Sequence, residues 1–166
     1  MYPVRLGYTT ALDRINALTA NGHHAEALVT SVATVEKTLR RTLRQLVVSA
    51  GFVSKMADRV VGSLHGLESV KDAWELYDPK HRKLTNLITP ADWKRIKDAS
   101  AMRNKLIHGE RVYALAACLE STKGVLVALG TIKELFDAEY AYSGWETAKS
   151  RRVSQLHRDP KVRIAR

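Results

Sequence analysis

Cysteine is nearly absent from this sequence of 166 residues, in which Cys118 is the only one. A single thiol cannot form an intramolecular disulfide, and it cannot build a zinc site based on cysteine ligands. Because Cys118 lies in an apolar run, we interpret it as a small core residue rather than a nucleophile. The sequence also lacks a glycine-rich phosphate loop, an HExxH motif and a serine nucleophile elbow, which excludes the site types that depend on them.

Long apolar runs are also missing. Residues 1–5 contain no apolar region of the kind that signal peptides carry. No apolar stretch approaches the ~20 residues that a helix needs to cross a bilayer. We therefore expect a cytoplasmic location and no membrane partner.

Acidic residues are too few to balance the basic ones. The chain has 27 Lys and Arg against 17 Asp and Glu, which gives a formal net charge of +10. This excess favours a polyanionic partner, nucleic acid first and an anionic membrane surface second. The alternative is a basic surface that only aids solubility, and charge alone does not exclude it.

Strand patterns are poor, since no alternating segment is bounded by hairpin turns. Apolar residues instead recur at three- and four-residue spacing, as in Leu28, Val32 and Val35, which is typical of helices packed on a core. We predict helices over about 9–20, 24–50, 54–77, 90–108 and 110–140, with the third weakened by two glycines. The predicted fold class is all-α, an antiparallel helical bundle of about five helices in one domain, residues 1–144.

A basic tail, residues 145–166, is expected to follow the bundle. Its last twenty positions hold seven basic side chains and one acid, Asp159. Such a tail is typical of a flexible arm that binds nucleic acid. A solvated terminal extension explains the same composition equally well.

The segment from Thr89 to Gly109 carries the clearest helix signals. Thr89 suits the N-cap, Pro90 the first helical position, and Asp92 the positive end of the helix dipole. Gly109 supplies a left-handed stop. At ~100° per residue, the apolar stripe of this helix consists of Trp93, Ile96, Ala99, Met102, Leu106 and Ile107.

Arg103 falls inside that stripe and is the anomaly of the helix. An inward guanidinium is costly unless it is paired and hydrogen-bonded. A buried carboxylate, a subunit interface or a bound anion would satisfy it. Glu36 lies beside the apolar positions of the second helix, so we predict a contact between Glu36 and Arg103. The simpler explanation is an ordinary buried ion pair or a side chain that reaches out to solvent.

Asn104 and His108 are four residues apart and share a helix face. His108 lies in the last turn, where the negative helix end favours its protonated form, and it also suits a simple C-terminal cap. Arg103 and His108 are five apart and diverge on one helix. Two copies related by a two-fold axis would bring both pairs into one cleft, so we predict a homodimer.

The run Arg103-Asn104-Lys105-Leu106-Ile107-His108-Gly109 resembles the signature of the HEPN superfamily. These are helical-bundle domains, many of them metal-independent endoribonucleases of toxin–antitoxin, phage-defence and CRISPR systems. The resemblance implies that Arg103 and His108 are the catalytic pair, that Asn104 supports them, and that Glu36 is a supporting acid. It also implies a dimeric cleft, with neither metal nor cofactor, and an antitoxin or operon partner protein.

The sequence departs from the family pattern at one position. Members paired with a nucleotidyltransferase antitoxin often carry tyrosine two residues after the histidine. Here that position is Glu110, and the nearest tyrosine is Tyr113. The departure puts pairing with that kind of antitoxin in doubt.

These residues could catalyse RNA cleavage without supplying a nucleophile, because RNA carries its own nucleophile in the 2′-hydroxyl. His108 can transfer protons near neutral pH, and Arg103 can hold the phosphate bidentately. We expect Lys105, Arg111, Arg151 and Arg152 to hold flanking phosphates. The alternatives are a non-catalytic HEPN-like module that dimerises or binds a nucleotide or partner, and a basic DNA-binding regulator.

Overall fold

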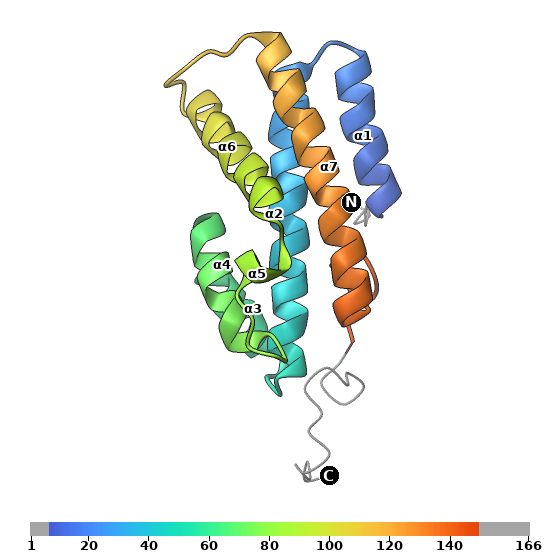
Figure 1. Cartoon of the computed structure of the whole chain (residues 1–166), viewed down its shortest axis with the longest axis vertical. Helices are drawn as coiled ribbons and strands as arrows, with labels where there is room; N and C mark the ends of the chain where they lie inside the picture. Colours follow the sequence, from blue (N-terminus) through green and yellow to red (C-terminus); the bar gives the residue numbers. More distant parts are fainter. Residues whose placement is uncertain (1–6, 150–166) are drawn as a thin grey trace.

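The structure, a computed structural model, describes residues 7–149. Within them the chain forms seven α-helices and no strand, which confirms the all-α prediction (Figure 1). The helices are α1 (Tyr8–Ala20), α2 (His24–Ser49), α3 (Ser54–Gly62), α4 (Gly66–Tyr77), α5 (Leu84–Leu87), α6 (Pro90–Ile107) and α7 (Leu115–Tyr140).

The two long helices α2 and α7 form the centre of the fold. Helix α1 packs on α2, helix α6 packs on both long helices, and α3 and α4 cover the second half of α2 (Figure 1). The prediction of an antiparallel bundle holds for α1 with α2 and for α6 with α7. Helices α2 and α7 instead run in the same direction, because the chain returns to the far end through α3 to α6.

Several predicted boundaries differ from the observed ones. The third predicted helix is divided into α3 and α4 at residues 63–65, where Gly66 takes a positive φ of 74°. The short helix α5 lies inside a segment predicted as a loop. Helix α7 begins at Leu115 rather than near residue 110. Helix α1 begins at Tyr8 and α3 at Ser54, and the residues before them, Gly7 and Val53, make no side-chain capping hydrogen bond.

Helix α7 corrects the expectation that no segment is apolar enough to span a bilayer. By length and composition alone it could cross a membrane, and 33% of its most apolar window is buried inside the bundle. The buried residues include Val125, Leu129, Ile132 and Phe136, and the ring of Phe136 stacks on Trp74 with the centroids 5.0 Å apart. The inward side of α7 is thus part of the hydrophobic core.

A buried polar network holds the end of the bundle where α4 and α7 finish. The Asp78 carboxylate accepts a hydrogen bond of 2.6 Å from the Tyr140 hydroxyl, which in turn accepts one from the Trp74 indole N–H. Arg82 donates to both carboxylate oxygens through its side chain, and its backbone N–H donates as well. The Lys80 backbone adds one more donor. This network joins α4, the following loop and the last turn of α7.

The first part of the expected tail is packed rather than extended from the bundle. The indole N–H of Trp145 donates to Thr38, and the side chain of Gln45 exchanges two hydrogen bonds of 2.9 Å with the backbone of Lys149. Gly144 has a φ of 89°, and a Cβ here would lie 3.1 Å from the carbonyl oxygen of Thr38. Residues 143–149 therefore lie along α2.

Candidate functional site

The start of α6 is built as predicted. The Thr89 hydroxyl accepts a hydrogen bond of 3.1 Å from the backbone N–H of Asp92, and Pro90 occupies the first helical position. The carboxylate of Asp92 is buried and pairs with Arg95 at 2.8 Å. These contacts fix the first residue of α6. Because the helix is regular, they also determine that residues 103–108 lie in its last turns.

Helix α6 is buried at its start and projects from the bundle at its end. Trp93, Ile96 and Ala99 are buried, but no later residue of α6 is. Figure 1 shows the reason, because the final turns of α6 lean away from α2 and α7. The prediction that Ile107 belongs to the apolar core stripe is therefore wrong, since its side chain is 52% exposed. Met102 and Leu106 still pack against the core, so the motif lies on a partly covered end of the helix.

Gly109 ends α6 in a Schellman arrangement. Its φ is 67°, its N–H donates to Leu106 at 3.2 Å, and the N–H of Glu110 donates to Lys105 at 2.9 Å. These are the two hydrogen bonds that satisfy the last carbonyl groups of a helix closed by a left-handed residue. The turn places His108 at the C-cap with its side chain exposed.

We expect Gly109→Ala to destabilise the fold by roughly 1–2 kcal/mol, since an L side chain in the left-handed region is strained. No atom lies within 4 Å of the added Cβ, so the cost comes from the backbone alone. Urea unfolding monitored by circular dichroism measures it. Gly130→Ala, inside α7 and also in open space, is the control and should be neutral or stabilising. Equal stabilities of the two variants would contradict the strain at Gly109.

Arg103 is half-buried and incompletely satisfied. One terminal nitrogen of its guanidinium donates to the side-chain oxygen of Asn104 at 3.0 Å. Its Nε is buried and has no hydrogen-bond partner. A buried N–H without an acceptor costs about 1–3 kcal/mol, so such atoms are rare in proteins without a ligand or a functional role.

The predicted pairing of Arg103 with Glu36 is wrong. Within residues 7–149, neither a hydrogen bond nor an ion pair of 4.0 Å or less joins the two side chains, and no other carboxylate pairs with Arg103. Glu36 lies in the middle of α2, and Arg103 lies in the last turns of α6. The charge of Arg103 is thus not compensated by a carboxylate of the described chain.

The other predicted site residues are only partly gathered. His108 and Lys105 are exposed at the end of α6, and Arg111 lies over the ring of Tyr113 with 4.9 Å to its centroid. Arg151 and Arg152 lie outside the described residues. The projecting end of α6 and the loop after it therefore combine four basic or titratable side chains with Asn104.

Exposed apolar side chains surround this end of the molecule. Val112 is 91% exposed and Leu115 is 57% exposed, in the loop after α6 and at the first turn of α7. Together with Ile107 they form what we call the apolar rim. Helical spacing predicts Leu115 in the apolar stripe of the last helix, so its exposure corrects that expectation, whereas Val112 lies outside the predicted stripe.

No family model, curated protein or solved structure matches this chain. The candidate site is therefore judged on its own side chains and their surroundings. Within residues 7–149 no three His, Cys, Asp or Glu side chains are grouped closely enough to hold a metal ion. The groups that the site does offer are an under-satisfied guanidinium, an amide and an exposed imidazole.

Proposed function

We propose that this protein is a metal-independent endoribonuclease of the HEPN type that works as a homodimer. The observation that carries the proposal is Arg103, whose guanidinium is half-buried, has an unpartnered Nε and lacks a carboxylate partner in the described chain. A cation in this state is suited to an anion from outside the chain, and a phosphate is the anion that a guanidinium binds bidentately. The net charge of +10 favours a polyanionic substrate as well.

In the proposed reaction His108 of one protomer takes the proton of a ribose 2′-hydroxyl as that oxygen attacks the adjacent phosphorus. The bond between phosphorus and the 5′ oxygen breaks, and His108 of the second protomer gives the leaving oxygen a proton. The products are a 2′,3′-cyclic phosphate and a free 5′-hydroxyl. Arg103 holds the non-bridging oxygens and stabilises their developing charge, while Asn104 holds the guanidinium in place.

The homodimer is supported by the apolar rim beside the motif. Ile107, Val112 and Leu115 are large apolar side chains with high exposure, and a second copy would remove them from water. A two-fold axis at this end of the molecule also places the two His108 side chains in one cleft, as the two proton transfers require. The proposal includes a cytoplasmic location and a role as a toxin or phage-defence effector with an antitoxin or operon partner.

The apolar rim favours one other candidate, a non-catalytic module of the same type. In that case the rim and Arg103 would hold a second copy or a partner protein, and a carboxylate of that partner would satisfy the guanidinium. This candidate predicts binding without RNA cleavage.

The purified full chain should cleave RNA in the presence of EDTA, and His108→Ala should lower the rate by about 10²–10⁴-fold, the usual contribution of a general acid or base. His65→Ala, an exposed histidine before α4, is the matched control and should keep the wild-type rate. Mapping of the product ends should show a 2′,3′-cyclic phosphate and a 5′-hydroxyl. Equal rates in wild type and His108→Ala would contradict the proposal, and a lack of cleavage of any RNA would favour the binding module.

A further inference from the structure

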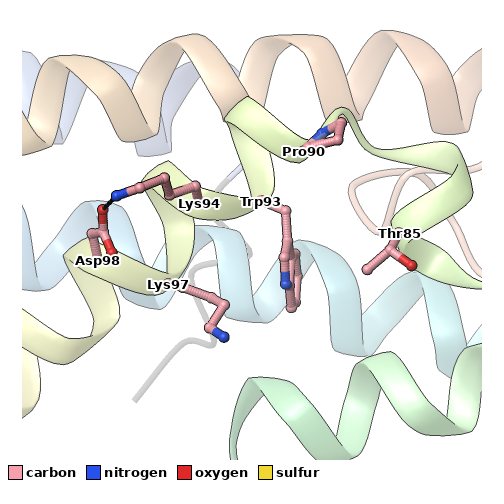
Figure 2. A pocket seen from close by; sticks show the side chains of 6 residues that line it. All are labelled: Thr85, Pro90, Trp93, Lys94, Lys97 and Asp98. Atoms are coloured by element: carbon pink, nitrogen blue, oxygen red, sulfur yellow. Dashed lines mark hydrogen bonds and ion pairs between the residues drawn. The ribbon is translucent and has the colours of Figure 1, made fainter.

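A pocket of about 340 Å³ lies between the first turns of α6 and the short helix α5, far along α6 from His108. Figure 2 shows the indole of Trp93 at its middle, with Pro90 and Thr85 to one side and the lysines to the other. The lining residues are Thr85, Pro90, Trp93, Lys94, Lys97 and Asp98. Trp93 is only 8% exposed, so the pocket combines the small accessible part of this ring with two ammonium groups.

The polar groups of this pocket are mainly donors. Lys94 pairs with Asp98, and Lys97 pairs with Glu68 of α4 at 3.2 Å. All four side chains of these pairs are exposed, so each pair contributes little and can exchange its carboxylate for another anion. The indole N–H groups of Trp74 and Trp145 donate hydrogen bonds, whereas that of Trp93 makes none within residues 7–149.

Two motif residues, Asn104 and His108, lie on the face of α6 that carries Lys97, whereas Arg103 projects about 120° away from Lys97. Lys97 and His108 are eleven residues apart, which is three helical turns and a rise of about 16 Å. Asn104 projects in nearly the same direction, and Ala101 between them is exposed and too small to block the surface. A continuous strip of helix surface therefore connects the Trp93 pocket with Asn104 and His108.

We propose that this strip holds single-stranded RNA next to the cleaved bond, with one nucleotide seated at Trp93 and its phosphates held by Lys94 and Lys97. The proposal rests on the proposed ribonuclease function and names the substrate class of that site. An unpaired base can enter this pocket and contact the accessible part of the Trp93 ring, and ammonium groups follow the RNA backbone. Duplex RNA does not fit, because its bases are paired and stacked inside the helix.

The test measures binding of a labelled single-stranded RNA of about ten nucleotides to full-length His108→Ala, which is not expected to cleave it. Adding Lys94→Gln and Lys97→Gln should weaken binding about tenfold at physiological salt. It should also reduce the slope of the logarithm of the association constant against the logarithm of the salt concentration by about 1.4, the value for two lost phosphate contacts on a single strand. Lys123→Gln, an exposed lysine of α7 paired with Glu120, is the control and should change neither quantity.

A second measurement reports on Trp93 directly. Bound RNA should quench tryptophan fluorescence in His108→Ala. Trp93→Phe in the same background should lose most of that quenching, while Trp74 and Trp145, which do not line the pocket, remain. Unchanged affinity and salt slope in the double lysine variant, or quenching that persists without Trp93, would overturn this proposal alone. Cleavage that survives His108→Ala would instead overturn the catalytic proposal and leave the binding result standing.

Discussion

Replacing Arg103 with methionine is expected to lower RNA cleavage by about 10²–10³-fold, the cost of losing one donor to a developing oxyanion. The same change should leave the free energy of unfolding unchanged or raise it by about 1 kcal/mol, because it removes a buried N–H that has no acceptor. A side chain that costs stability and supports activity is what functional sites typically contain. Initial rates in EDTA and urea unfolding of the same preparation measure the two effects.

Arg95→Met is the matched control for this prediction. Arg95 lies on the same helix but pairs with the buried carboxylate of Asp92, so its loss leaves a buried charge less compensated. This variant should be destabilised and should keep its cleavage rate per folded molecule. The proposed role of Arg103 is wrong if Arg103→Met shows this pattern too, since Arg103 would then be a structural side chain.

The features that could be predicted from sequence are those determined by neighbouring residues. The Thr89 cap, the proline after it and the left-handed Gly109 are local signals, and both ends of α6 lie where these signals placed them. The half-burial of Arg103 was predicted in the same way from its place in the apolar stripe.

The features that were missed depend on how helices are oriented in space. A helical wheel assumes a constant buried face, but α6 leans outward, so Ile107 is exposed and Glu36 does not pair with Arg103. The parallel course of α2 and α7 and the Trp93 pocket likewise arise from packing between distant segments. The Asp78 network joins residues 62 positions apart, and no local pattern indicates it.

Asp78→Asn is expected to destabilise the fold by about 3–5 kcal/mol, the cost of removing one partner of a buried charge pair. The Asp78 side chain is fully buried, and it accepts hydrogen bonds from Tyr140, Arg82 and two backbone N–H groups. In asparagine an NH₂ group replaces one carboxylate oxygen. This donor would face the donors that surround the side chain, and the hydrogen bonds to the replaced oxygen would be lost. Urea unfolding followed by circular dichroism at neutral pH measures the loss.

The control is Asp58→Asn, since Asp58 also pairs with an arginine, Arg44, at 2.6 Å but is 61% exposed. An exposed pair of this kind contributes roughly 0–1 kcal/mol. The two variants therefore compare the same chemistry with and without burial. Comparable losses in both would show that the Asp78 network does not hold the α4 and α7 ends together.

The same carboxylate should make the fold sensitive to acid. Burial on its own raises the pKa of Asp78, but the hydrogen bonds from Arg82 and Tyr140 outweigh it and lower this pKa from 3.8 to about 2. A group whose pKa is lowered in the folded state adds stability above its unfolded pKa and loses it as the pH falls towards the folded value. The contribution of roughly 2 kcal/mol should thus be complete at pH 5 and disappear towards pH 2. Because Asp78→Asn cannot titrate at this position, its unfolding free energy should fall less over that range than that of the wild type, and parallel pH profiles would contradict the assignment.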